Sequence, residues 1–183
     1  MHRNVHGGIR LTVAQAIAEF LREKKVTTAF GIIGAGNIAL FDAIARKKAT
    51  EIVCCHHEQA AVMAANAWAR VRGDGAVGVA IVTTGAGSAN AITGALAALM
   101  DRAPVLIISG NEPSRYLYAD CRVAGVQGFK TGEAVEPFVK LARTLGGIDM
   151  PMECMHEAWE TALSGRRGPV WLDCPRDTFN ATV

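Results

Sequence analysis

The sequence predicts an α/β domain, in which a doubly wound, mainly parallel sheet carries helices on both faces. Three observations predict it. Segments with the period of an amphipathic helix alternate along the chain with short apolar segments. One short segment, residues 77–83, is apolar at almost every position, as is typical of a parallel strand covered on both faces. Glycine-rich turns follow two of the apolar segments, at the points where helices are expected to begin.

The first helix is predicted to begin at Thr12, because Thr12 and Gln15 have the spacing of a capping box before an apolar stripe. Strands are then expected at residues 28–33, 52–55, 77–83, 105–109 and 170–173, with a short strand at 138–141. Helices are expected at 38–46, 59–72, 88–100 and 151–163. Pro175 is expected to end the last strand. Residues 111–131 are predicted to be a long irregular segment, of a kind that is often functional.

Composition excludes several classes of protein. At 183 residues we expect residues 1–10 to form an extension and residues 11–183 a single domain. A net charge of +2, with scattered Lys and Arg, argues against a nucleic acid partner and against a membrane surface. No apolar run reaches the roughly 18 residues of a membrane helix. The five cysteines have irregular spacing, which indicates reduced thiols and a cytoplasmic protein.

The most informative residue is Glu58, which stands between a short apolar strand and an alanine-rich helix. Open α/β sheets bind their ligands at the carboxyl ends of their strands, where this carboxylate is expected. A glutamate in the first turn of a helix also stabilises the helix dipole by about 0.3–1 kcal/mol. That role accounts for an exposed glutamate, but not for the apolar residues at 52–55 and 60–63. A carboxyl in apolar surroundings is suited to proton transfer.

Two glycine turns leave a second interpretation open. Residues 34–39 fit the G-x-G-x-x-G/A pattern of a dinucleotide site, and Glu51 and Glu58 lie near the spacing of its ribose-binding acid. A full helix precedes the first strand, however, and an equally prominent glycine loop follows another strand at 83–90. Both turns are also explained by close approach of the backbone. A dinucleotide-binding oxidoreductase domain therefore stays an alternative.

The run of possible metal ligands at residues 54–57, Cys-Cys-His-His, is assigned a structural role. Neighbouring side chains on an extended segment point to opposite faces, so four in a row do not converge on one ion. The spacing also matches no common zinc pattern. We expect buried thiols and a histidine that orients the start of the following helix.

Taken in order, the motifs resemble the amino-terminal, pyrimidine-binding domain of thiamine-diphosphate enzymes of the acetolactate synthase type. The resemblance extends from Leu11 to Asp177. It rests on Phe30-Gly31, His57-Glu58-Gln59-Ala60-Ala61, Thr83-Thr84-Gly85-Ala86-Gly87 with Asn90, Asp101-Arg102-Ala103-Pro104-Val105, Gly168-Pro169-Val170-Trp171 and Pro175-Arg176-Asp177.

The resemblance implies thiamine diphosphate as the cofactor, with Glu58 as the catalytic residue. Glu58 would hydrogen-bond N1′ of the aminopyrimidine ring and share a proton with it, which favours the imino form that deprotonates the thiazolium. The residues implied to bind the cofactor are Ile33, Gly34, Glu58, Thr83, Gly85, Gly87 and Asn90. Those implied to lie on the substrate side are Ala35, Thr83 and Gln127.

Some residues depart from the family pattern. Gln127 resembles the glutamine of a Phe-Gln-Glu segment, whose other two positions are Val126 and Gly128 here. Ala86 stands where the family usually has proline. These departures bear on the substrate more than on the cofactor. Residues 73–75, Gly-Asp-Gly, resemble the opening of the family's metal- and diphosphate-binding motif, but its asparagine some two dozen residues later is absent, so we predict a plain turn.

The activity implied is that of a thiamine-diphosphate-dependent 2-oxo acid decarboxylase or carboligase. The ligands of Mg²⁺ and of the diphosphate are expected on a separate partner subunit, and a heterotetramer is the expected assembly. The chain alone is not expected to be active. Two further alternatives stay open, a non-catalytic regulatory or assembly subunit on the same fold and an excised domain of a longer enzyme. The sequence does not name the donor 2-oxo acid or the acceptor.

Overall fold

A single parallel sheet forms the centre of the computed structural model, which describes residues 10–73, 75–117, 125–128, 130–146 and 150–183. In these ranges six strands pair in the order β2-β1-β3-β4-β6-β5, and every pairing is parallel. The strands are β1 (Thr28–Gly31), β2 (Glu51–Cys54), β3 (Gly78–Val82), β4 (Val105–Asn111), β5 (Leu141–Thr144) and β6 (Val170–Pro175). The predicted parallel α/β sheet is confirmed.

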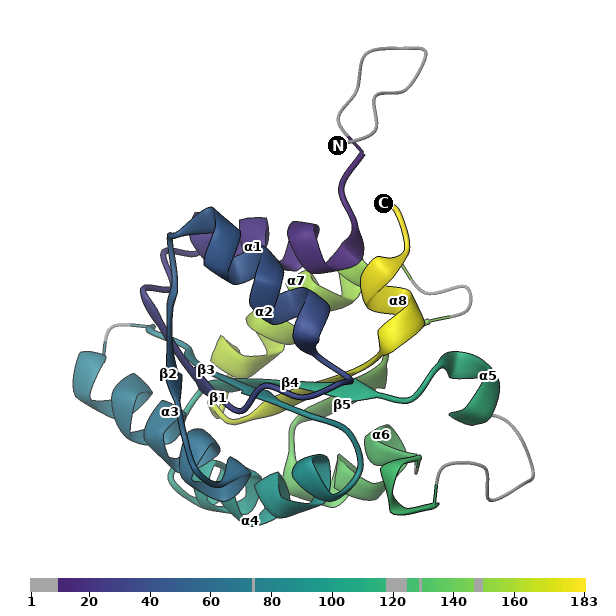
Figure 1. Ribbon diagram of the computed structural model, residues 1–183. Coiled ribbons are helices and arrows are strands. Elements are labelled where there is room, and N and C mark those ends of the chain that lie inside the picture. The colour runs from purple at the N-terminus through teal and green to yellow at the C-terminus, as the bar shows by residue number, and fades with distance from the viewer. Residues whose placement is uncertain (1–9, 74, 118–124, 129, 147–149) are drawn as a thin grey trace.

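Helices cover both faces of the sheet (Figure 1). One face carries α1 (Val13–Glu23), α2 (Ile38–Lys47), α7 (Pro151–Leu163) and α8 (Arg176–Asn180). The opposite face carries α3 (Glu58–Arg72), α4 (Ala86–Met100) and the short α6 (Thr131–Val135). Short helical turns α5 (Ser114–Leu117), η1 (Gly125–Gln127) and η2 (Glu136–Phe138) complete the described elements. This arrangement is doubly wound, as the alternation of strand and helix predicts.

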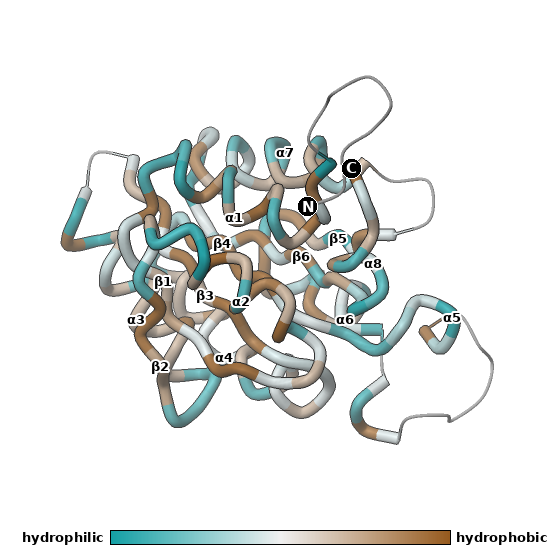
Figure 2. Tube along the Cα trace, turned by 45° about the horizontal axis from the view of Figure 1, so that its top comes forward, coloured by the Kyte–Doolittle hydropathy of each residue, from teal (hydrophilic) through white to brown (hydrophobic). Residues whose placement is uncertain are grey.

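The core divides into two layers because successive residues of a strand point to opposite faces of the sheet. Val79 and Ile81 of β3 pack under α1 and α2, whereas Ala80 and Val82 pack under α3 and α4. Figure 2 shows the hydrophobic residues gathered along the central strands, with hydrophilic residues on the outer turns.

On the α3/α4 face, small residues allow close packing. A Cβ at Gly94 of α4 would lie 2.7 Å from the Cβ of Val62 in α3. No described helix is both long and apolar enough to cross a bilayer.

Several predicted boundaries differ from the structure. The strand expected at 138–141 is wrong: residues 136–138 form a 3-10 turn with Pro137 at its start, and the strand is Leu141–Thr144. Its position is set by pairing with the neighbouring strand, from Leu141 opposite Val170 to Thr144 opposite Asp173. The helix expected from residue 88 begins at Ala86, because Gly85 turns the chain with a φ of 57°. The segment 111–131 is partly helical, and residues 118–124 and 129 lie outside the described part.

The strand order reverses between β1 and β3. From β1 the chain passes through α2 to β2 on one side, then returns through α3 to β3 on the other side of β1. In open α/β sheets, a crevice at the carboxyl ends of the strands forms at such a switch point. The turn after β1 and the loop after β3 therefore meet at the edge of the sheet where a ligand is expected.

Candidate active site

The candidate site lies at the carboxyl ends of three neighbouring strands. The turn at residues 34–37 follows β1, Glu58 follows β2, and the glycine loop at 83–87 follows β3. These segments are separated by at least twenty positions in the chain and meet because β1 lies between β2 and β3. Most residues that the sequence analysis assigned to a site are thereby brought together.

Glu58 is the first residue of α3 and is buried, with 8 % of its surface exposed. The His57 imidazole caps the helix, since its Nδ1 accepts a hydrogen bond from the Gln59 backbone N–H at 3.2 Å. The Asn90 amide of α4 donates to Glu58 Oε2 at 3.0 Å. Glu58 thus belongs to α3 and is fixed by a side chain of α4. Among the described residues, no hydrogen bond is donated to its Oε1.

Glycine is required next to this carboxylate. A Cβ at Gly87 would lie 2.9 Å from Glu58 Oε1 and 2.7 Å from Thr83 Cγ2. A Cβ at Gly34 would lie 2.1 Å from Thr83 Oγ1. Thr83 thus sits between the two glycine turns and joins the β1 side of the crevice to the β3 side.

The Thr83 hydroxyl is the polar atom that this packing leaves without a partner. Its Oγ1 is buried and makes no hydrogen bond within the described residues. A buried hydroxyl without a partner costs about 1–3 kcal/mol, so such groups in folded proteins call for an explanation. A ligand that supplies a hydrogen-bonding group at this crevice would account for it.

Gln127 reaches the site from the segment after α5. The Thr84 hydroxyl donates to Gln127 Oε1 at 2.7 Å. A Cβ at Gly85 would lie 2.4 Å from both the Gln127 Cα and the Val126 carbonyl oxygen, so the turn at 125–127 rests directly on the glycine loop. The structure therefore places Gln127 beside Thr84 and Gly85, although its side chain remains exposed.

Ile33 and Ala35 lie on the rim rather than inside. Both are exposed, Ile33 by 53 %, on the turn that follows β1. Asn37, which is fully buried, fixes that turn: its Oδ1 accepts from the Gly34 N–H at 2.8 Å, and its Nδ2 donates to the Ile32 carbonyl at 3.0 Å. No site role for Asn37 or Thr84 was predicted from the sequence. An asparagine directly before a helix is a recognisable turn signal, whereas nothing local marked Thr84.

The same contacts explain the G-x-G pattern of the turn. Gly34 is required by Thr83, and a Cβ at Gly36 would lie 2.2 Å from Thr84 Cγ2 and 3.3 Å from the Gly110 carbonyl carbon. The Gly34 N–H is already bonded to Asn37. Packing between loops accounts for both glycines, so the G-x-G pattern no longer favours a dinucleotide site.

The surroundings of the Cys-Cys-His-His run at residues 54–57 indicate a structural role. The expected burial of both thiols is wrong: Cys54 is exposed because β2 is an edge strand of the sheet, and Cys55 is partly buried, where desolvation raises the pKa of its thiol. In the described part of the chain, no three His, Cys, Asp or Glu side chains are grouped as metal ligands.

Gly73 and Gly75 have φ values of 62° and 79°, and the Ala76 N–H donates to the Gly73 carbonyl at 2.8 Å. This geometry confirms the predicted turn, whose Asp74 lies outside the described residues.

Comparison with known proteins identifies the family. The family model described as thiamine pyrophosphate enzyme, N-terminal TPP binding domain, matches residues 11–134. The chain is 34 % identical over 175 residues to an acetolactate synthase large subunit of Haemophilus influenzae, covering 93 % of this chain and 29 % of the relative. It is 36 % identical over 177 residues to an acetolactate synthase of Arthrospira platensis, covering 95 % and 30 %.

A third relative, the large subunit of acetolactate synthase isozyme 2 of Escherichia coli, is 36 % identical over 165 residues, which cover 90 % of this chain and 29 % of that protein. The chain thus spans less than a third of the length of these relatives. The matched region contains Glu58, both glycine turns and Gln127. The chain belongs to the thiamine pyrophosphate enzymes and corresponds to their N-terminal TPP-binding domain.

Proposed function

We propose that this chain supplies the pyrimidine-binding half of the active site of a thiamine-diphosphate-dependent 2-oxo acid decarboxylase or carboligase. The observation that carries the proposal is the buried Glu58 carboxylate at the carboxyl edge of the sheet, held by Asn90 and bordered by Gly87. The names of the relatives, acetolactate synthases, agree with this class of reaction. The other half of the site, with the ligands of Mg²⁺ and the diphosphate, would be carried by a separate subunit.

The residues present fit the aminopyrimidine end of the cofactor. The carboxyl edge of the sheet offers the buried Glu58 carboxylate beside Gly87, and the Thr83 hydroxyl, which has no partner among the described residues. A heteroaromatic ring with nitrogen donors and acceptors needs such polar groups at short range. Ile33, Gly34, Glu58, Thr83, Gly85, Gly87 and Asn90 would hold this end.

Glu58 would work as the proton-holding residue. Asn90 fixes Oε2 and leaves Oε1 to face the crevice next to Gly87, so one carboxylate oxygen is oriented and the other is available for a ligand nitrogen. Thiamine diphosphate, when bound, supplies the ring that accepts the electrons released as a 2-oxo acid loses CO2. The contribution of this chain is a carboxyl that donates and accepts one proton at a fixed position.

Gln127 would bind the substrate. Its Oε1 accepts from the Thr84 hydroxyl, which turns the amide so that Nε2 is left as a donor. Within the described residues that NH2 group has no protein acceptor. An amide donor at the exposed edge of the site is suited to the carboxylate or carbonyl oxygen of a 2-oxo acid, and Ala35, on the turn after β1, would also lie on the substrate side.

The surface beside the site is suited to a partner chain. Met63 (39 %), in the second turn of α3, is an exposed large apolar side chain near Glu58, and Leu96 (37 %), Val71 (87 %) and Met100 (64 %) extend the apolar surface along the two helices toward the opposite edge of the sheet. The two helices pack against each other and contribute Glu58 and Asn90 to the site. A partner that covered this face would enclose the crevice, and two such pairs would give a heterotetramer.

The first test is isolation of the protein from its own source in the presence of thiamine diphosphate and Mg²⁺, followed by native mass spectrometry. A complex with a second polypeptide and bound cofactor is the expected result. A homo-oligomer that binds no cofactor would contradict the proposed half-site.

The second test uses that assembly and the variant Glu58→Gln, which keeps the size of the side chain but removes its acidity. Turnover of 2-oxo acids should fall by about 10²–10⁴-fold, the usual contribution of a general acid or base. Glu51→Gln, an exposed carboxyl in β2, is the matched control and should stay within a few-fold of wild type. If Glu58→Gln changed assembly or regulation while turnover persisted, a non-catalytic subunit would replace the proposal.

A further inference from the structure

The edge strand β2 leaves one side of its backbone unpaired. It pairs with β1 on one side, and among the described residues no strand pairs with its other side (Figure 1). The backbone N–H groups of Glu51 and Cys55 donate toward β1, to the carbonyls of residues 27 and 31, at 2.9 Å each. Because the polar groups of successive residues in a strand point to alternate sides, the N–H and C=O groups of Ile52 and Cys54 point outward. The strand therefore presents a row of donors and acceptors to a further strand.

The edge strand on the opposite side of the sheet, β5, is protected in two ways that β2 is not. Arg143 of β5 pairs with Glu157, and α6 packs against the strand, where a Cβ at Gly132 would lie 2.6 Å from Thr144 Oγ1. Charged side chains and covering helices prevent edge strands from pairing with other chains. β2 contains no lysine, arginine or proline, and its Val53 is 40 % exposed. The contrast indicates that the β2 edge is kept available for pairing.

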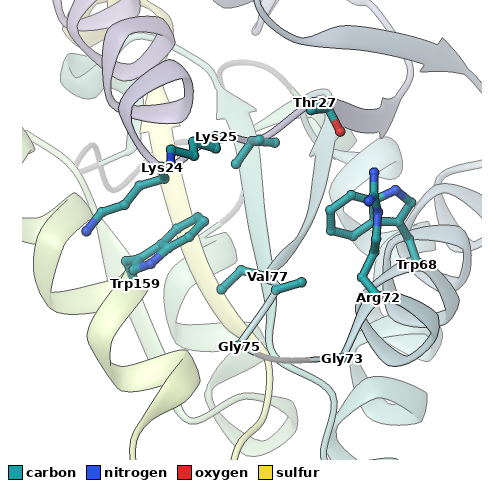
Figure 3. Close-up of a pocket in the computed structure, with 11 residues that line it drawn as sticks. Lys24, Lys25, Thr27, Trp68, Arg72, Gly73, Gly75, Val77 and Trp159 are labelled. Carbon is teal, nitrogen blue, oxygen red and sulfur yellow. The ribbon is translucent and has the colours of Figure 1, made fainter.

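Apolar hollows flank this edge on both faces of the sheet. The first, of about 470 Å³, lies on the α2 face, where Ile52 and the exposed Ile38 line it. The second, of about 400 Å³, lies on the α3 face and is lined by Phe30, whose register partner in β2 is Val53. Trp68, whose ring Figure 3 shows projecting from α3, also lines the second hollow. A strand added beside β2 would therefore find apolar surface for its side chains on either face.

We propose that β2 is the docking strand for a second copy of this chain, so that one sheet continues through a symmetric dimer. Antiparallel pairing about a two-fold axis through Val53 sets Ile52 of each copy opposite Cys54 of the other. This register gives a partner to every outward group of those two residues. An axis through Ile52 or through Cys54 would instead pair one of them with a residue outside the strand. The inference goes beyond the proposed function, and its test needs neither cofactor nor turnover.

Charge and packing across this axis favour a copy of the chain as the occupant. The exposed Glu51 comes to lie opposite Cys55 and next to the exposed His56 of the other copy, so like charges do not meet. At the axis the two Val53 side chains cover each other, with their Cα atoms about 4.5 Å apart. One short strand is too little for a stable interface, which usually buries about 800 Å² on each partner. The hollows on the two faces supply the further apolar surface.

Sedimentation of the purified chain at micromolar and higher concentrations tests the dimer. We expect a species with twice the 19.4 kDa mass of the chain. Val53→Lys should raise the dissociation constant at least about tenfold, because two like charges then lie directly opposite each other at the axis. Met100→Lys is the matched control, since Met100 is also an exposed apolar residue but stands at the end of α4, away from β2. The control should dimerise as the wild type does.

A disulfide tests the register, in a background that carries Cys54→Ser and Cys55→Ser. Val53→Cys should link the copies on oxidation, because Cα atoms about 4.5 Å apart are within reach of a disulfide. Glu51→Cys, on the same face of β2, would set its thiols more than about 13 Å apart and should not link. The proposal is overturned if the chain stays monomeric at every concentration, if Met100→Lys dissociates the dimer while Val53→Lys does not, or if Glu51→Cys links as readily as Val53→Cys.

Discussion

Asp173 makes the stability of this protein depend on pH in a direction that is unusual for a carboxyl group. The side chain is fully buried in β6, where desolvation raises its pKa from an ordinary value of 3.8 to about 7. Two hydrogen bonds oppose the rise: Ser109 Oγ donates to Oδ1 at 2.6 Å, and Asn111 Nδ2 donates to Oδ2 at 2.6 Å. Burial outweighs both of them.

The sign of the effect follows from proton binding. Between pH 3.8 and 7 the unfolded chain has released the proton, whereas the folded chain still holds it, so stability falls as the pH rises. Below 3.8 both states are protonated and the contribution is fully present. The difference of about 3 pKa units corresponds to about 4 kcal/mol, since one unit is about 1.4 kcal/mol. This loss should be complete just above pH 7.

The perturbation is Asp173→Asn, which removes the titration and keeps the shape. The amide has one donor end, which would face either the Ser109 hydroxyl or the Asn111 amide. This mismatch should make the variant about 1–3 kcal/mol less stable than wild type with Asp173 protonated, and the stability of the variant should not depend on pH through this position. Relative to wild type, therefore, the variant should be most destabilised near pH 4 and should regain about 4 kcal/mol by pH 7.5.

Urea unfolding at half-unit pH intervals from 4 to 8, followed by circular dichroism, measures the free energy of unfolding of both proteins. Glu19, whose pKa is lowered to about 2 by hydrogen bonds to Arg22 and Lys47, acts in the opposite direction and mainly below pH 4.5, so it cancels in the comparison. Asp42→Asn, an exposed carboxyl, is the control and should give a nearly parallel curve. If Asp173→Asn also ran parallel to wild type, the reasoning from burial would be refuted.

Three further predictions concern packing and caps, each measured as the free energy of unfolding in urea. Gly34→Ala should cost about 2 kcal/mol, because its Cβ would lie 2.1 Å from Thr83 Oγ1. In the control, Gly168→Ala, the nearest atom to the new Cβ is Cδ of the flexible Lys140 side chain at 3.0 Å. An equal cost for both variants would contradict the packing argument. Thr12→Ala should cost about 1 kcal/mol by removing the capping box of α1, and no loss would mean that the cap is not formed in solution. Lys140→Met should cost about 1–2 kcal/mol, because Nζ donates to two carbonyls at the end of α7; an unchanged stability would show that water replaces it freely.

Much of the fold could be predicted because its signals are local. The alternation of helical and strand periods determines the α/β class, and the continuous apolar run in β3 indicates a strand buried on both faces. The strand at 138–141 was wrong because an edge strand of mixed polarity carries little local signal. Its place is decided by pairing with β6, and its register starts at Leu141 opposite Val170.

The candidate site could be predicted less completely. The run around Glu58 and the two glycine turns stand out in the sequence, and the roles assigned to them stay predictions that the proposed experiments test. Thr84 could not be found in this way, because its partner Gln127 is 43 positions away and meets it only after the turn at 125–127 rests on Gly85. Asn37 was visible as a turn residue, but its two bonds to the backbone were not.

The sequence by itself determined the class of the fold, the family and the carboxylate at the carboxyl edge of the sheet, because periodicity and short motifs are properties of neighbouring residues. Only the tertiary structure decided why Gly34 and Gly87 are glycines, that the Asp173 carboxyl is buried with no charge partner among the described residues, and that Trp68 and Trp159 line one pocket (Figure 3). Each of these depends on strand order. The order β2-β1-β3-β4-β6-β5 places segments that are distant in the chain within contact distance, and no local pattern encodes those distances.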